Sequence, residues 1–354
     1  MALKDNVLKF SKRQIDEAGN VLINADSSFE EKNSALEVLG NFRSCHAYPI
    51  NTFQATLRTK LNKTGIDYLV SQRLKRTPSM LLKLERFPNM RLSQMQDIGG
   101  LRAILPTMKD VEKIVQLYKK APLQHVIKSE KDYIQQPKDS GYRCYHIVYK
   151  YKNNTNSNYD GLMIELQIRT RLQHAWATAV ETMGTFIDHS LKSSQGPQEW
   201  LDFFSLVGNA FAYIEKTPTL SIYNHLTKEE VFEKVKSDAQ NLQVITQLEG
   251  FSEVISNIET DKKQGSLHLI VLDISNKEVR IKTFPKNAIE QASMEYLKEE
   301  ALISDGSKKQ VVLVSSNSLD SLRKAYPSYF LDTQEFIKTL RQITNSSTKH
   351  SYYL

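Results

Sequence analysis

The feature that most constrains the fold is an alternation of short β-prone runs with helical runs between about residues 66 and 170. The β-prone runs are DYLVSQRL, GLRAILP, HVIKSEKDYI, YHIVYKY and GLMIELQIR. Two runs with apolar residues at helical spacing, PSMLLKLERF and VEKIVQLYKK, separate the first three of them. This alternation predicts an α/β (α+β) fold in which helices cover a mixed β-sheet.

The rest of the chain is divided by helical and polar stretches. A second, smaller α/β stretch follows the polar segment IETDKKQGS, because SLHLIVLDIS and EVRIKTF alternate apolar and polar residues like a hairpin that turns at Asn276 and Lys277. We therefore predict five parts: a helical N-terminal segment 1–65, a core 66–195, a helical extension 196–261, a small α/β domain 262–345 and a tail 346–354.

Composition restricts the partners. The 354 residues carry a formal net charge of +7 with a pI near 9.1, which favours a polyanionic substrate such as a nucleotide or RNA, and no DNA partner is expected. Cys45 and Cys144 lack metal-ligand spacing, so we expect neither a disulfide framework nor a zinc site, and a cytoplasmic location. No signal-like start and no run of about 18 apolar residues is present, so no membrane contact is expected.

A basic cluster, RLKRTPSMLLKLER, is typical of an anion site. Arg73 and Lys75 lie on one face if the segment is extended, because side chains alternate along a strand. Pro78 ends the strand, and Ser79 is expected to cap a short helix that carries Lys83 one turn on. These cations and the helix N-terminus would suit a phosphate chain. The alternative is a solvated basic strand end.

Two carboxylates on separate strands suggest a magnesium site. Asp97 precedes the strand GLRAIL, and Glu165 alternates with apolar residues in GLMIELQIRT, so this strand has one polar and one apolar face. Mg²⁺ usually takes one or two carboxylates and leaves its other positions to water and phosphate. A half-buried strand at a sheet surface is the alternative explanation for Glu165.

Between these motifs, PKDSGYRCYH reads as a loop that enters a strand, because Pro, Asp, Ser and Gly favour turns. Taken alone, it is more simply interpreted as a surface hairpin with an exposed lysine. Four stretches, RLKRTPSMLLK, DIGGLR, KDYIQQPKDSGYRCYH and ELQIRTRLQHAWA, together resemble in order and spacing the synthetase domain of the RelA/SpoT family over residues 66–185. The resemblance implies a nucleotidyltransferase-like fold that transfers the β,γ-pyrophosphate of ATP to a ribose 3′-hydroxyl with Mg²⁺.

The resemblance also implies residue roles. Asp97 and Glu165 match the catalytic magnesium carboxylates, and Glu165 is placed to help deprotonate the attacking hydroxyl. The positions that match ATP or phosphate contacts are Arg73, Lys75, Ser79, Lys83, Arg102, Lys131, Lys138 and His146. The acceptor side is expected to comprise Tyr142, which would stack on the acceptor base, Gln167 and Arg169. His174 and Trp176 also fit the family pattern, although core packing explains both equally well.

One departure concerns the acceptor. Family members commonly have a serine-leucine pair before the loop histidine, and this chain has Cys144 and Tyr145, which argues against the usual guanine nucleotide. Toxic relatives often modify the 3′-terminal adenosine of tRNA, so the 3′-CCA end of tRNA is the lead acceptor. The alternatives are an alarmone synthetase that makes ppGpp or ppApp from guanine or adenine nucleotides, and an inactive RNA-binding module.

Near the C-terminal end, KAYPSYFLDTQEF contains Tyr326 and Tyr329 in a YxxY spacing. The plain interpretation is a turn with two half-buried tyrosines. The spacing also resembles the self-neutralising element of CapRel-type fused toxin-antitoxins in phage defence. That resemblance implies that these tyrosines block nucleotide binding until a phage protein releases them.

Overall fold

The computed structural model describes residues 7–120, 124–154, 157–186, 191, 194–245, 248, 267–273, 278–285, 287–302, 309–315 and 334–346. Tyr326 and Tyr329, the hairpin turn at Asn276 and Lys277, and the boundary expected near residue 262 lie outside the described residues.

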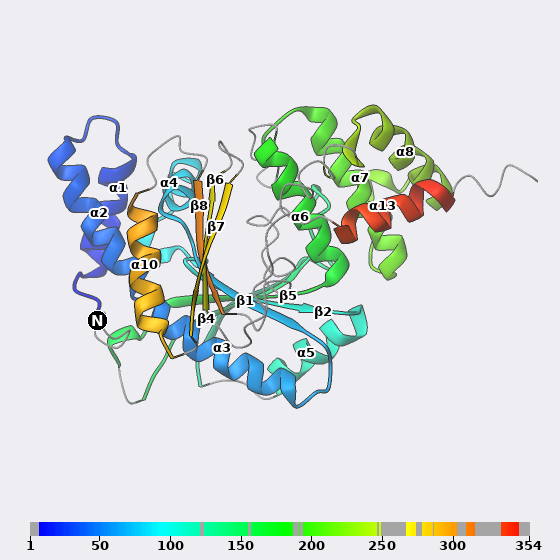
Figure 1. Cartoon of the computed structure of the whole chain (residues 1–354). Helices are drawn as coiled ribbons and strands as arrows, with labels where there is room; N and C mark the ends of the chain where they lie inside the picture. Colours follow the sequence, from blue (N-terminus) through cyan, green and yellow to red (C-terminus); the bar gives the residue numbers. More distant parts are fainter. Residues whose placement is uncertain are drawn as a thin grey trace, which may run out of the picture.

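A five-stranded mixed sheet forms the centre of the molecule, with strand order β1-β2-β5-β4-β3 (Figure 1). Strands β2 and β5 run parallel, and the other neighbours pair antiparallel. The mixed α/β fold expected from the alternating runs is therefore confirmed. The strands are β1 (Leu69–Leu74), β2 (Gly99–Leu105), β3 (Val126–Asp132), β4 (Tyr145–Lys150) and β5 (Met163–Thr170).

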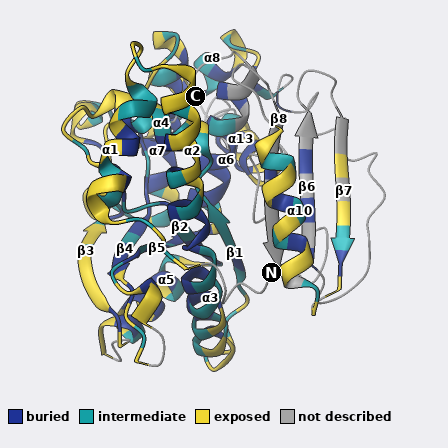
Figure 2. Cartoon of the chain, turned by 90° about the vertical axis from the view of Figure 1, so that its left-hand side faces the viewer, coloured by how far each residue is buried: buried dark blue, intermediate teal, exposed yellow. Residues whose placement is uncertain are grey.

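The two faces of this sheet differ in polarity. Ile164, Leu166 and Ile168 of β5 are at most 1% exposed and pack into the main core with helices α3 (Ala47–Asn62) and α5 (Met108–Lys120). Figure 2 shows β2, β4 and β5 largely as buried residues, whereas α3 and α5 have both buried and exposed residues. The alternate β5 residues point to the opposite face, which is the polar face predicted from the sequence.

Short helices flank the edge of the sheet at β1. Helices α1 (Lys12–Ile23) and α2 (Phe29–Ser44) pack together, and a capping box at Ser28 starts α2. Helix α4 (Thr77–Arg86) follows β1 directly. The expectation that Ser79 caps α4 was wrong: the N-cap residue is Arg76, because Pro78 is tolerated in the first helical turn and the helix begins before it.

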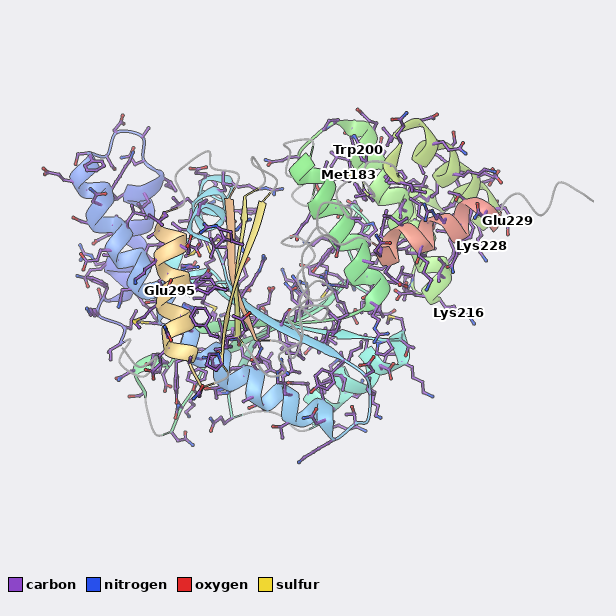
Figure 3. The ribbon with its side chains drawn as sticks, viewed as in Figure 1. Met183, Trp200, Lys216, Lys228, Glu229 and Glu295 are labelled. Atoms are coloured by element: carbon purple, nitrogen blue, oxygen red, sulfur yellow. The ribbon has the colours of Figure 1, made fainter. Side chains whose placement is uncertain are left out.

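A helical bundle is held together by a second cluster of buried side chains. It consists of α6 (Arg171–Phe186), α7 (Gln198–Glu215), α8 (Lys228–Asn241) and α13 (Gln334–Ser346), the last from the C-terminal part of the chain. Figure 3 places Met183 and Trp200 within this bundle, where both are buried. In the part of the chain that the structure describes, no helix combines the length and apolarity needed to cross a membrane.

A small second sheet packs beside β1. Its strands, in the order β7-β6-β8, are all antiparallel, and α10 (Ile289–Ala301) covers one face. The strands are β6 (Leu267–Asp273), β7 (Glu278–Phe284) and β8 (Lys309–Ser315). We call β6–β8 with α10 the C-terminal sheet module. Strand β8 contacts β1, and Leu74 packs against the core of the module.

Candidate active site

The strand register places several of the predicted site residues on the polar face of the central sheet. Arg73 pairs with Gly100, which pairs with Glu165 on the next strand. Gln167 lies opposite Arg102 on one side and His146 on the other, and Lys131 pairs with His146. Because paired residues project to the same face, the register alone gathers these charges. The residues on this face are Arg73, Arg102, Lys131, His146, Glu165 and Gln167.

Asp97 is the centre of a cationic cluster at the start of β2. Its Oδ2 accepts a hydrogen bond from Lys75 Nζ at 3.0 Å, and its Oδ1 accepts one from Lys83 Nζ at 2.8 Å. Burial alone would raise the pKa of Asp97, but the two ammonium groups lower it to about 2. The pKa of Lys75 is lowered because its burial outweighs the attraction of Asp97. Asp97 is therefore ionised at neutral pH.

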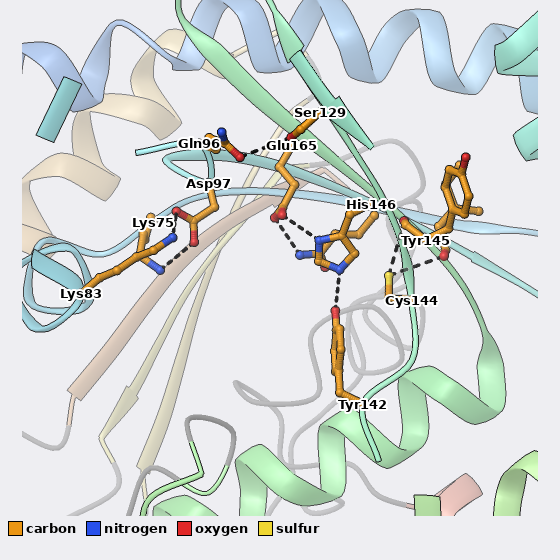
Figure 4. Close-up of polar contacts among 12 residues, drawn as sticks. Lys75, Lys83, Gln96, Asp97, Ser129, Tyr142, Cys144, Tyr145, His146 and Glu165 are labelled. Atoms are coloured by element: carbon orange, nitrogen blue, oxygen red, sulfur yellow. Dashed lines mark hydrogen bonds and ion pairs between the residues drawn. The ribbon is translucent and has the colours of Figure 1, made fainter. Parts of the chain in front are cut away.

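Glu165 is the centre of a second polar cluster (Figure 4). Its Oε1 lies 2.8 Å from His146 Nδ1, and its Oε2 accepts from Gln167 Nε2 at 2.8 Å. The Tyr142 hydroxyl lies 2.8 Å from His146 Nε2. Burial alone would raise the pKa of Glu165, but His146 lowers it. Burial opposes protonation of His146, yet its neighbours Tyr142, Cys144 and Glu165 raise its pKa well above the usual value.

These shifts describe an ion pair of imidazolium and carboxylate at neutral pH. The protonated His146 ring donates from Nδ1 to Glu165 and from Nε2 to the Tyr142 hydroxyl. Both carboxylate oxygens of Glu165 are already hydrogen-bonded in this arrangement. A carboxylate stabilised in this way is a weak base, so Glu165 must exchange a partner before it accepts a proton.

An aromatic patch lies beside this ion pair. The Lys138 ammonium is 5.3 Å from the centre of the Tyr142 ring and 4.7 Å from that of Tyr133. The Tyr133 ring packs edge-on against His146, with centroids 5.2 Å apart. Sequence reasoning missed Tyr133, although it lies in the same motif, KDYIQQPKDSGYRCYH, and the alternation of aromatic and basic residues there could have indicated it.

Three predicted residues, including Lys131 of the polar face, take no part in the contacts described above. Ser79 is half-buried in the first turn of α4, and Lys131 is exposed on β3. Arg169 is 3% exposed and contacts the His174 ring, and burial lowers its pKa to about 10. Arg169 thus offers almost no surface to an acceptor in this structure. His174 and Trp176 are also buried, at 6% and 5% exposure, in agreement with the packing interpretation.

The loop that carries Tyr142 is anchored to α7 by contacts that the sequence did not reveal. Arg143 is buried, and its Nη1 donates to the carbonyl oxygens of Gly208 at 2.8 Å and Gly141 at 3.0 Å. Gly141 has a φ of +87°, and a Cβ at Gly208 would lie 2.7 Å from its Cα. The Ser205 hydroxyl donates to the Asp139 carbonyl at 2.6 Å. No local pattern could indicate partners 65 residues away.

The two residues that depart from the family pattern are both buried. Cys144 is 0% exposed, and its thiol contacts the Ile168 carbonyl at 3.5 Å. Tyr145 is 3% exposed and lies on the face of β4 opposite to His146, where its hydroxyl donates to Glu130. Neither side chain forms surface that an acceptor could touch, so this departure is a weaker argument against a guanine nucleotide than the sequence suggested.

The carboxylates fit a metal ion that is shared with phosphate. Asp97 and Glu165 point to the same side of the sheet in Figure 4, and the charge of Asp97 acts on the pKa of Glu165. Among the described residues, no group of three or more histidine, cysteine or acidic side chains could hold a metal ion. Two carboxylates are the usual protein contribution to a Mg²⁺ that also binds nucleotide phosphates.

Comparison with known proteins shows which family the central part of the chain resembles. Residues 72–185 match the family described as a region found in RelA/SpoT proteins. In Bacillus subtilis, it is similar to GTP pyrophosphokinase YjbM, with 36% identity over 124 residues, covering 34% of this chain and 54% of that protein. GTP pyrophosphokinase YwaC, also from Bacillus subtilis, is 33% identical over 84 residues, covering 24% of this chain and 40% of that protein.

The chain thus spans about half the length of these curated relatives, or less. Among solved structures, it is similar to the small alarmone synthetase 1 from Bacillus subtilis bound to its product pppGpp. That match has a TM-score of 0.42 and 26% identity, and covers 48% of this chain and 89% of the other.

Proposed function

We propose that this chain is an ATP pyrophosphokinase, which transfers the β,γ-pyrophosphate of ATP to a ribose hydroxyl. The observation that carries the proposal is the placement of two charge clusters on the same side of the central sheet: Asp97 with Lys75 and Lys83, and Glu165 with His146 and Tyr142. Pyrophosphoryl transfer requires positioning and neutralisation of negative charge more than covalent help, so such clusters suffice. The names of the curated relatives support the same reaction.

The cationic cluster is suited to the donor. Lys75 and Lys83 are partly exposed, with 16% and 26% of their side chains accessible, so an incoming phosphate chain can contact both ammonium groups. Arg73 and Arg102 extend this positive surface along the same sheet face. ATP phosphates would compete with Asp97 for the lysines and release its carboxylate.

Asp97 and Glu165 are the residues that would hold Mg²⁺. The ion would supply neutralisation of the phosphate charge as the pyrophosphate moves. The lowered pKa of Glu165 makes its carboxylate a better ligand than base, so we assign it first to metal binding and second to deprotonation of the hydroxyl. His146, held protonated beside it, contributes a further positive charge close to the transferred group.

The acceptor would stack on Tyr142. Lys138 lies over the Tyr142 and Tyr133 rings and can meet an acceptor phosphate there. A guanine nucleotide is the acceptor that the relatives' names suggest. The 3′-CCA end of tRNA is the second candidate, favoured by the net charge of +7, because an unpaired base can stack on the same ring.

We also propose that the C-terminal sheet module restrains the enzyme. The module packs against β1, the strand that carries Arg73 at the donor side. Arg43 joins the two parts: it donates to the Lys75 carbonyl at 2.7 Å and to Glu300 of α10 at 3.0 Å. A toxin restrained in this way, and released by a phage protein, is the biological role that the YxxY resemblance favours.

The test is a transfer assay with the full chain, Mg²⁺, γ-labelled ATP and a mixture of GDP, GTP and bulk tRNA. Label in a guanine nucleotide identifies an alarmone synthetase, and label in tRNA identifies a tRNA-modifying enzyme. Asp97→Asn should reduce transfer at least about 100-fold, whereas Asp26→Asn, which removes an exposed carboxylate outside the site, should not. ATP binding that ignores Mg²⁺, with no transfer to any acceptor, would instead indicate an inactive RNA-binding module.

A further inference from the structure

Helix α13 completes the bundle that supports the acceptor loop. Its residues Phe336, Ile337, Leu340 and Ile343 are at most 2% exposed and belong to one cluster with residues of α6, α7 and α8. Helix α13 contacts α6 and α8, and among the described residues it has no comparable contact with the C-terminal sheet module. Although it follows that module in the chain, α13 is therefore structurally part of the helical bundle (Figure 1).

A continuous row of aromatic rings leads from α13 to the site. The Phe336 ring lies 5.6 Å from that of Phe211 and 6.1 Å from that of Phe204 on α7. Phe204 packs edge-on against Trp176 of α6 at 6.4 Å, and the Trp176 ring lies 6.3 Å from that of Tyr142. Close-packed rings transmit a displacement because the interior has few voids to absorb it.

Backbone contacts reinforce the same route at Phe204. Its carbonyl oxygen accepts a hydrogen bond from Trp176 Nε1 at 2.9 Å. The same carbonyl would lie 3.0 Å from a Cβ at Gly141, so the loop backbone rests directly on α7 at this residue. Phe204 thus contacts α13 through its ring and supports the Tyr142 loop through its backbone.

We infer that α13 positions the acceptor site, with Phe336 as the positioning residue that holds Tyr142 in place through Phe204 and Trp176. The inference rests on the proposed pyrophosphokinase function, and it separates two roles within the C-terminal part of the chain. The sheet module packs on the donor side at β1, whereas α13 supports the acceptor side. Removing everything after residue 262 would therefore damage acceptor binding, and autoinhibition is better tested with Tyr326→Ala and Tyr329→Ala in the full chain.

The experiment compares Phe336→Ala and the milder Phe336→Leu with Lys338→Ala, an exposed position on the same helix, all in the full chain. Hydrogen exchange is followed in the loop 137–146 and in the donor strand 97–105. We expect Phe336→Ala to speed exchange in the loop by about tenfold, Phe336→Leu by less, and Lys338→Ala not at all, with the donor strand unchanged in each variant. Trp176→Phe, which removes the bond to the Phe204 carbonyl, should loosen the loop and leave α13 protected.

Kinetics provide the second readout. In Phe336→Ala the KM for the acceptor that wild type labels should rise about tenfold, and the KM for ATP should stay within about twofold. Faster exchange in α13 with an unchanged loop, or equal changes in both KM values, would overturn the inference. If Phe336→Ala does not fold, hydrogen exchange of the loop in Phe336→Leu and Trp176→Phe tests the inference instead. If neither wild type nor the full-chain double variant Tyr326→Ala with Tyr329→Ala labels any acceptor, the proposed function fails. Hydrogen exchange still shows whether α13 holds the loop.

Discussion

Arg43 should be the residue on which docking of the C-terminal sheet module depends most. Its side chain is 4% exposed, and its partner Glu300 is 8% exposed, so the ion pair is almost fully removed from water. Its Nη2 also donates to the Tyr296 hydroxyl, and its Nε donates to the Lys75 carbonyl. Arg43→Met keeps the length of the side chain but leaves the Glu300 carboxylate buried without its counter-charge. The expected loss is about 3–5 kcal/mol in the free energy of unfolding.

The measurement is urea unfolding combined with hydrogen exchange in α10. Protection of α10 should fall before that of the central sheet, because the broken contact joins the module to α2. The double variant Arg43→Met with Glu300→Leu removes both charges, and it should recover most of the loss. The matched control is Arg13→Met, which breaks an ion pair with Glu17 on the surface of α1 and should leave stability unchanged.

Two results would refute this reasoning. A loss below about 1 kcal/mol in Arg43→Met would mean that the ion pair is not effectively desolvated. A double variant no more stable than the single one would mean that Arg43 acts through the Lys75 carbonyl or the Tyr296 hydroxyl rather than through Glu300.

Three further predictions follow from the site. Gly208→Ala places a Cβ 2.7 Å from Gly141 Cα, so it should destabilise the chain by about 1–3 kcal/mol in thermal unfolding, whereas Gly40→Ala on the open face of α2 should stabilise it. The pKa of Asp97 is lowered from the ordinary 3.8 to about 2 in the folded chain. The ionised carboxylate therefore contributes roughly 2 kcal/mol to the free energy of unfolding above about pH 4, and this contribution is lost as the pH falls toward 2. In pH-dependent unfolding, a decline of the same size in Asp97→Asn would contradict that assignment. Tyr142→Phe should keep the acceptor KM within a few-fold, whereas Tyr142→Ala should raise it by about tenfold or more, and equal effects would exclude stacking.

The sequence predicted the central sheet well because the alternation of polar and apolar residues that defines a strand is a local pattern. Alternation in GLMIELQIRT correctly placed Glu165 and Gln167 on one face and the apolar residues of the strand on the other. The predicted N-cap of α4, Ser79, was wrong by three residues, because Pro78 lies in the first turn of that helix and does not mark the end of the strand before it.

The contacts that hold the site together were beyond sequence reasoning. The close approach of Gly141 to Gly208, and the reach of Arg143 to α7, join residues that are far apart in the chain. The apolar stripe of α13 does not by itself tell which surface it covers. Burial of Phe336 against α7 became visible only in the folded chain.

The position of α13 in the chain has a consequence for biosynthesis. About 150 residues separate the end of α6 at Phe186 from the start of α13 at Gln334. At typical translation speeds of about 5–20 residues per second, the ribosome needs on the order of 10 s to make this stretch. Throughout that interval the nascent protein already has its donor strands and its acceptor loop, but it lacks the helix that steadies the loop. The acceptor site inferred above would thus be fully positioned only when nearly the whole chain has been made.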